Sequence, residues 1–351
     1  MRQASAAMLW KPLVTVLMLS SASASAANAT AASITSVPPP YPTFGNIERL
    51  GPALNDLLAA DATMEKLAEG FNWSEGPIWV PKSGHLLFSD VPENVVYRWH
   101  ARDGVSIFLR PSGFTGDAYD GREPGSNGLT LDREGRLVLC QHGDRRVARL
   151  NPDGKTFTTV AGRYQGGRFN SPNDLCYDRS GNLYFTDPPY GMGPGTVREI
   201  EFQGVYRMTP DGTVTLVSSE LERPNGLALS PDERTLYVAN SHGPRPIIMS
   251  FELRGDGKPS PPGVVFFDST RLVEQGRRGA MDGMKVDQKG NVWATGPGGV
   301  LVINAAGKHL GTLLTDRATA NCAFAEDGST LYITADDVLC RIKTRVKGCG
   351  F

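Results

Sequence analysis

Short apolar segments alternate with polar turns along most of the chain, in a unit that recurs six times. Each unit opens on a polar residue, usually followed by glycine and then by a short apolar stretch; the opening residues are Glu75, Asn127, Asn173, Asn225, Asp282 and Asn321. Successive openings lie 39 to 57 residues apart. This spacing is close to the roughly 40 to 50 residues of a four-stranded propeller blade.

A turn follows every opening at a nearly constant distance, seven to nine residues along, at Gly84, Gly135, Gly181, Glu233, Gly290 and Gly328. A strongly apolar triplet follows each turn, as expected of a buried strand, at residues 86–88, 137–139, 183–185, 236–238, 292–294 and 331–333. A two-sheet sandwich would not require this constant offset. We therefore predict an all-β fold, a six-bladed β-propeller with four-stranded antiparallel blades, over residues 65–351.

The N-terminal region differs from the repeats. Arg2 and Lys11 precede the apolar run 13–19, and the small residues 22–26 follow it, a pattern typical of a cleaved signal peptide. The run is shorter than the roughly 20 residues of a membrane span. We expect residues 1–26 to be removed, the mature protein to be periplasmic or secreted and free of the membrane, and the proline-rich residues 27–64 to form a linker or arm.

Composition limits the partners. Lys and Arg number 36 against 37 for Asp and Glu, so the net charge of −1 gives no general attraction to nucleic acid or anionic membrane. A small molecule is the expected partner, and the protein is expected to be a monomer or a small homo-oligomer. The five cysteines are too few and too scattered for a disulfide scaffold or a paired zinc site, although Cys340 and Cys349 are close enough in sequence to bridge.

The opening residues supply candidate metal ligands. The first strand of each propeller blade lines the central channel, so the six openings should converge near the axis, where all of them offer side-chain oxygen. Oxygen ligands suit Ca²⁺, with Mg²⁺, Mn²⁺ or Zn²⁺ as possible substitutes. For a single repeat, Asn-Gly is ordinary turn chemistry, but the carboxylates Glu75 and Asp282 would be costly near the axis without a cation.

The second strands should run back to the same mouth of the channel and end at its rim. Their ends place Asp187, His142 and His242 there, and the connection containing Arg168 leads into Asn173. Either histidine could act as a base or could be a hydrogen-bonded structural residue.

Several short sequence segments resemble the gluconolactonase, regucalcin (senescence marker protein 30) and strictosidine-synthase-like propellers, most closely the bacterial gluconolactonases. These segments are residues 74–77, 141–146, 171–174, 181–191 and 223–227, and the resemblance runs from about residue 65 to 343.

The resemblance implies one catalytic divalent ion held by Glu75, Asn173, Asn225 and Asp282. It also implies an acid–base role for Asp282 and a substrate-binding arginine near the first asparagine, for which Arg168 is the candidate. Asn127 and Asn321 fall outside the family's ligand set and are expected to bind substrate or water. The remaining expected substrate contacts are His142, Tyr190 and His242.

A metal-dependent lactonase mechanism follows. The chain has no G-x-S-x-G or H-E-x-x-H motif, so water is the expected nucleophile, with Asp282 or Asp187 as its proton acceptor. The metal would polarise the carbonyl of a sugar lactone such as glucono-1,5-lactone, which would open to gluconate. Two alternatives remain, a metal-dependent hydrolase of another lactone, ester or phosphotriester and a non-catalytic binding propeller, because the fold alone does not choose among them.

Overall fold

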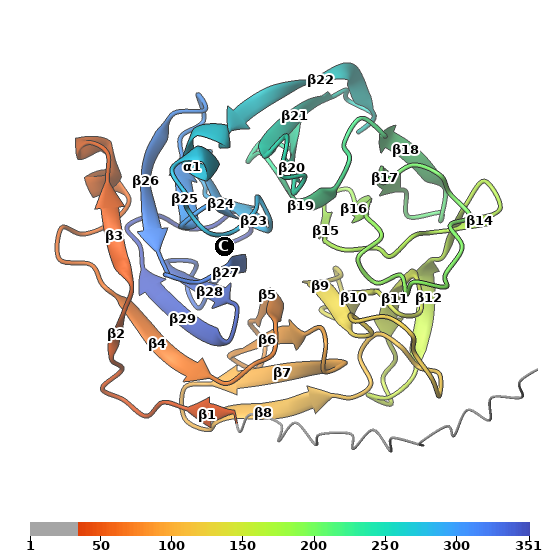
Figure 1. Cartoon of the computed structure of the whole chain (residues 1–351), viewed down its shortest axis with the longest axis horizontal. Helices are drawn as coiled ribbons and strands as arrows, with labels where there is room; N and C mark the ends of the chain where they lie inside the picture. Colours follow the sequence, from red (N-terminus) through yellow and green to blue (C-terminus); the bar gives the residue numbers. More distant parts are fainter. Residues whose placement is uncertain (1–33) are drawn as a thin grey trace, which may run out of the picture. The chain divides into compact units, whose positions relative to one another are not determined.

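Six antiparallel sheets surround a central axis in the computed structural model, which describes residues 34–351 (Figure 1). In the first four sheets the strand nearest the axis comes first along the chain and the next strands pair outward in order; the last two sheets follow the same order but add strands from the N-terminal segment at their outer edges. The six-bladed propeller predicted from the repeats is therefore confirmed.

The first four blades are each built from four consecutive strands. They comprise β5 (Ser74–Val80), β6 (His85–Asp90), β7 (Val95–His100) and β8 (Gly104–Leu109); β9 (Ser126–Leu131), β10 (Leu137–Gln141), β11 (Arg146–Leu150) and β12 (Phe157–Ala161); β15 (Leu175–Tyr177), β16 (Leu183–Asp187), β17 (Gly204–Met208) and β18 (Val214–Ser218); and β19 (Pro224–Leu229), β20 (Thr235–Asn240), β21 (Ile247–Leu253) and β22 (Pro259–Asp268).

The last two blades take strands from the segment expected to be a linker or arm. The fifth contains β23 (Met284–Val286), β24 (Val292–Gly296), β25 (Gly299–Ile303), β26 (His309–Leu314) and, at its edge, β3 (Asn46–Arg49). The sixth contains β27 (Thr319–Ala325), β28 (Thr330–Ala335), β29 (Val338–Lys343) and β4 (Met64–Glu69), with β1 (Thr35–Ser36) and β2 (Thr43–Phe44) paired to β4. The beginning and end of the described chain thus share one sheet, which closes the ring.

The turn that repeats between first and second strands has a left-handed backbone. Gly84, Gly135 and Gly181 have φ values of 63°, 75° and 85°, and Glu233 holds the equivalent position at 58°. Glycine adopts this conformation without steric cost, whereas other residues pay roughly 1–2 kcal/mol. The constant offset in the sequence therefore reflects a turn geometry that recurs in the repeats. Glu233 adopts this geometry at a cost in backbone strain.

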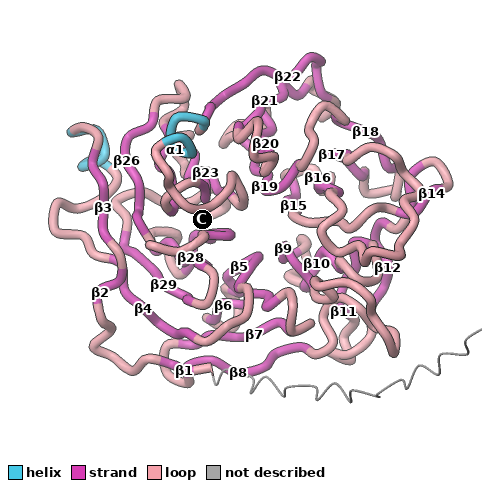
Figure 2. The backbone as a smooth tube through the Cα atoms, in the orientation of Figure 1, coloured by secondary structure: helices cyan, strands magenta, loops and turns pink. Residues whose placement is uncertain are grey.

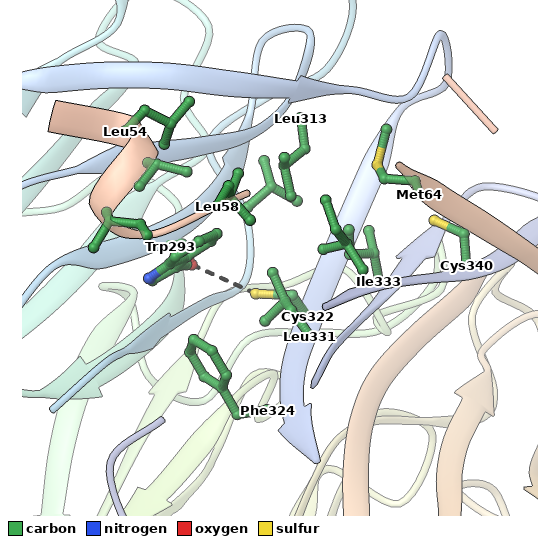
Figure 3. Close-up of a cluster of buried hydrophobic side chains, with 14 of the residues drawn as sticks. Leu54, Leu58, Met64, Trp293, Leu313, Cys322, Phe324, Leu331, Ile333 and Cys340 are labelled. Atoms are coloured by element: carbon green, nitrogen blue, oxygen red, sulfur yellow. Dashed lines mark hydrogen bonds between the residues drawn. The ribbon is translucent and has the colours of Figure 1, made fainter. Parts of the chain in front are cut away.

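The blades are held by apolar side chains packed between neighbouring sheets. Figure 3 shows one such cluster, in which Leu54, Leu58 and Met64 of the N-terminal segment meet Trp293 of the fifth blade and Ile333 of the sixth. All five side chains are almost wholly buried. Because burial of a large aliphatic or aromatic side chain contributes about 1.5–3 kcal/mol, this cluster fixes the N-terminal segment to the last two blades.

Helices are few and short: the 3₁₀ turn η1 (Pro52–Asp56) and α1 (Thr270–Glu274) (Figure 2). A small hairpin of β13 (Arg163–Tyr164) and β14 (Gly167–Arg168) lies outside the blades. Over residues 34–351 no helix is long and apolar enough to cross a membrane. The predicted signal peptide, residues 1–26, lies outside the described residues.

The five cysteines are unpaired. Cys340 is buried on β29, whereas Cys349 is exposed beyond the end of that strand. The disulfide considered from their sequence proximity is absent from the structure.

Candidate active site

A cavity of about 260 Å³ lies where the inner strands begin. The strand starts that surround it face the centre of the ring in Figure 1. Its lining includes six residues that the sequence had singled out: Glu75, Asn127, Asn173, Asn225, Asp282 and Tyr190. The structure therefore brings together all four family-implied metal ligands and two of the expected substrate contacts.

Glycine follows four of the six opening residues because the inner strands approach one another closely. A Cβ atom on Gly76 would lie 2.1 Å from the Asn127 carbonyl oxygen, and one on Gly226 would lie 2.3 Å from that of Asp282. The backbone N–H of Gly128 donates to the Asn173 carbonyl at 2.7 Å. The glycine after the opening residue thus allows the backbones of neighbouring blades to approach closely. This close approach places the opening side chains in one site.

Three amides form a hydrogen-bonded chain around one side of the cavity. Asn127 Nδ2 donates to Asn173 Oδ1 at 3.0 Å, and Asn173 Nδ2 donates to Asn225 Oδ1 at 2.6 Å. Asn225 Nδ2 then donates to Ser241 Oγ at 2.9 Å. An amide oxygen has two lone pairs, so Asn225 Oδ1 keeps further capacity and Asn127 Oδ1 has no hydrogen-bond partner, whereas Asn173 Oδ1 also lies 3.1 Å from His142 Nε2.

Glu75 and Asp282 supply the negative charge of the cavity. Glu75 Oε2 accepts from the Gly76 N–H at 2.8 Å and from Asn321 Nδ2 at 3.2 Å, yet burial, reinforced by the nearby Asp174 charge, raises the pKa of Glu75 to about 8. Burial and the Glu75 charge raise the pKa of Asp282 well above its ordinary value, and its buried Oδ1 has no hydrogen-bond partner. Within residues 34–351 neither carboxylate has an ion-pair partner, so a bound cation would favour the ionised form of both.

The donors of this cavity fit a hard divalent cation. They include the carboxylates of Glu75 and Asp282 and three amides, all of them oxygen ligands of the kind that Ca²⁺ prefers. In the described part of the chain no three His, Cys, Asp or Glu residues cluster so as to hold a metal by themselves. Amide oxygens would therefore have to complete any coordination shell begun by Glu75 and Asp282.

Asp174 is a buried carboxylate that the repeat analysis overlooked. It stands where most repeats have glycine, and it accepts from the Leu175 N–H at 2.9 Å and from Asn321 Nδ2 at 3.4 Å. Burial raises its pKa, an effect that the positive charge of Lys285 partly offsets. The departure from glycine at this position was the signal in the sequence that could have identified it.

Glu123 is a third carboxylate in the cavity lining, carried by the loop between β8 and β9. Its Oε2 lies 3.2 Å from His142 Nδ1, at an orientation that makes no hydrogen bond, and His142 Nε2 lies 3.1 Å from Asn173 Oδ1. His142 is completely buried. It therefore supports Asn173 from behind the lining, and no periodic pattern in the sequence marks Glu123.

Arg223 is the cation of the cavity lining, and its guanidinium lies 5.7 Å from the centre of the Tyr190 ring. Burial, with a contribution from the Asp282 charge, raises the pKa of Tyr190 to about 12, so this phenol stays protonated at neutral pH. Both residues can donate hydrogen bonds to oxygen atoms of a ligand.

Besides His142 and Asn321, three predicted site residues lie away from the cavity lining. Asp187 is buried at the end of β16, where its Oδ2 accepts from the Asn170 N–H at 2.8 Å, and burial raises its pKa to about 7. Arg168 lines a different cavity on the hairpin β13–β14, and His242 is not among the residues that line the axial cavity. The lining residues that sequence reasoning did not assign are Glu123, Arg223 and Ser241.

The family and its members were identified by comparison with known proteins. The model of the SMP-30/gluconolactonase/LRE-like region matches residues 73–337. A gluconolactonase from Zymomonas mobilis is 39% identical over 313 residues, covering 87% of this chain and 88% of the relative. A regucalcin from Xenopus laevis is 26% identical over 278 residues, covering 77% of this chain and 85% of that protein.

A solved structure has the same fold. The gluconolactonase XC5397 from Xanthomonas campestris superposes with a TM-score of 0.76 at 32% sequence identity, covering 88% of this chain and 100% of the other. The matched region includes the whole of the axial cavity described above.

Proposed function

The chain belongs to the SMP-30/gluconolactonase/LRE-like family, and we propose that it is a lactone hydrolase that opens glucono-1,5-lactone to gluconate with a divalent cation. One observation carries the proposal: Glu75 and Asp282 share a cavity with three amides, and their charge has no ion-pair partner. A site of this kind is stabilised by a cation and has room for a small ring.

The cation would be held by Glu75, Asn173, Asn225 and Asp282. Ca²⁺ is the preferred candidate because the donors are oxygen atoms, with Mg²⁺, Mn²⁺ or Zn²⁺ able to replace it. When bound, it would polarise the lactone carbonyl and stabilise the negative charge that develops on that oxygen.

The chain's own residues would handle the proton and orient the lactone. Water attacks the carbonyl carbon and loses its proton to the free Oδ1 of Asp282. As the bond between that carbon and the ring oxygen breaks, protonated Asp282 returns its proton to the ring oxygen, which leaves as the hydroxyl of the hydroxy acid. Asp282 is favoured over Asp187 because Asp282 lines the cavity, whereas Asp187 is fastened to backbone behind it.

The sugar hydroxyls would be recognised by the polar wall of the cavity. Arg223, Tyr190 and Asn127 can donate hydrogen bonds, and Glu123 can accept them. A polyhydroxylated ring satisfies these groups better than an apolar ester, which supports a sugar lactone as the substrate.

Export is the second part of the proposal. Residues 1–26 have the order of charged, apolar and small residues of a signal peptide. N-terminal sequencing of the protein recovered from periplasm or medium should begin near Ala27. A form in that compartment beginning at Met1 or Arg2 would contradict cleavage.

The test of the function is acid release from glucono-1,5-lactone by chelator-treated protein, with Ca²⁺, Mg²⁺, Mn²⁺ and Zn²⁺ returned separately and the spontaneous rate subtracted. Activity lost with the chelator and restored by at least one ion supports the proposal. Full activity in the chelator contradicts the metal requirement. Hydrolysis of an aryl ester or phosphotriester at a higher kcat/KM than the lactone would favour the other hydrolase class, and no hydrolysis of any of them would favour a binding protein.

A further inference from the structure

A second cavity, of about 420 Å³, is lined by residues of the second blade and of the hairpin β13–β14. Figure 2 shows β14 near β12, at the periphery of the ring. The lining of this cavity includes four arginines together with Asp144 and Thr159; the arginines are Arg145, Arg146, Arg163 and Arg168. It shares no lining residue with the axial cavity. The lactone hydrolysis proposed above uses none of the four arginines.

Two carboxylates only partly neutralise this cluster. Asp144 Oδ2 is paired with Arg146 Nη2 at 2.9 Å. Glu199 is shared, since its oxygens lie 3.8 Å from Arg145 Nη1 and 3.6 Å from Arg163 Nη1, distances too long for good hydrogen bonds.

Other charged groups near the cluster leave its excess of positive charge unchanged. The Asp187 charge acts on Arg145, and the Arg198 charge acts on Asp187. Because these two charges are opposite, they cancel in the total. Four guanidinium groups against two carboxylates leave a net excess of two positive charges, and Arg168 has no ion-pair partner among the described residues.

Arg145 is held rigidly with part of its guanidinium unused. Its side chain is 6% exposed, and its Nε donates to the carbonyl oxygens of Phe169 at 2.8 Å and Asn170 at 3.0 Å. Its buried Nη2 has no acceptor. An unpaired buried donor on a cation is costly, and burial together with the nearby Arg168 charge lowers the pKa of Arg145.

We propose that this cavity binds a phosphate dianion, either free or as the phosphate group of a small ester. Planar guanidinium groups bind phosphate oxygens through paired, charge-assisted hydrogen bonds. A dianion matches the two uncompensated charges, and Thr159 adds a neutral donor to the lining. The site is distinct from lactone hydrolysis and would stand or fall independently of it.

Titration calorimetry with inorganic phosphate at constant ionic strength, on the full protein, tests the site. Arg163→Gln removes an exposed guanidinium of the cluster and should weaken binding about threefold to fivefold. Glu199→Gln removes the competing charge while keeping an oxygen that can accept from the Arg168 N–H, and it should tighten binding by a similar factor. Arg136→Gln is the matched control, because Arg136 is an arginine paired with Asp132 and Glu134 elsewhere on the surface.

The source of the phosphate is resolved by comparing inorganic phosphate, glucose 6-phosphate and glucose. Binding of the two phosphates without glucose supports the site; tighter binding of the ester identifies an ester ligand, and equal or weaker binding identifies the free anion. The proposal is overturned if neither phosphate binds, or if Arg163→Gln and Arg136→Gln change the affinity equally. Arg145 is left intact throughout, because its backbone contacts make a folding defect the expected result of replacing it.

Discussion

The two ends of the central channel are formed by the same inner strands but have opposite character. At one end the strand starts carry Glu75, Asn225 and Asp282 around the 260 Å³ cavity. At the other end, where these strands finish, a cavity of about 360 Å³ is lined largely by apolar side chains such as Trp79, Leu227 and Phe324. Strand geometry alone therefore does not create the polar cavity; the residue type at the start of each strand does.

The largest expected effect is at the polar end. Asp282→Asn keeps a ligand oxygen but removes the proton acceptor, so kcat should fall by about 10²-fold or more while metal binding is partly retained. Glu75→Gln should first weaken metal affinity, with activity partly restored by excess Ca²⁺. Rates and metal affinities measured on both variants check this.

Two outcomes would change this assignment. If both variants lose metal equally and both recover in excess ion, Asp282 is a ligand only. If Asp282→Asn is fully active without added metal, the metal-dependent mechanism fails.

The apolar end should affect stability without affecting chemistry. Phe324 is 5% exposed and packs edge-on against Trp293 with ring centres 5.8 Å apart. Phe324→Ala should lower the free energy of unfolding by about 3 kcal/mol, while kcat/KM of the folded protein stays within about threefold of wild type. Chemical denaturation and lactonase assays below the transition measure the two effects, and a large loss of kcat/KM would show that the ends are coupled.

The next variant concerns Asp187, a buried residue that does not line the axial cavity. Burial raises the pKa of Asp187 from 3.8 to about 7, so the folded protein binds more protons than the unfolded chain between these values. Stability from this group is therefore lost as pH rises through that interval. The decrease in the free energy of unfolding between pH 4 and pH 8 should therefore be about 1–3 kcal/mol smaller in Asp187→Asn than in the wild-type protein.

The same variant tests the choice of base. Asp187→Asn should keep lactonase activity within about tenfold of wild type, since its side chain does not line the cavity. A loss as large as that of Asp282→Asn would move the base to Asp187.

The smallest expected effect concerns the repeated turns, which lie outside the axial cavity, although Glu233 lines the apolar one. Gly135 has φ of 75° and open space where a Cβ would lie, so Gly135→Ala should cost only the backbone strain, about 1 kcal/mol of unfolding free energy. Glu233→Gly relieves that strain but loses the acceptor for the Arg179 N–H, so its effect should be closer to zero. Denaturation midpoints of both variants test this, and equal destabilisation would show that φ does not explain the repeat.

The repeat pattern was sufficient to predict the propeller and the residues that gather on its axis. All six opening residues could be predicted to gather near the axis because periodicity in the chain becomes rotation about one axis. The choice of Glu75, Asn173, Asn225 and Asp282 among them came from the family resemblance. The sequence also carried the turn geometry, since a left-handed backbone favours glycine at a fixed offset.

Only the tertiary structure decided which other groups join the site. Glu123 reaches the cavity from a loop with no periodicity, and Arg168 is turned toward a separate arginine cluster although it is near Asn173 in sequence. Loop paths depend on contacts between distant segments, as does the use of residues 35–49 as sheet edges in the last two blades. The sequence by itself determined the repeat and its axial chemistry, whereas packing determined the rim, because only there do residues without a common period come into contact.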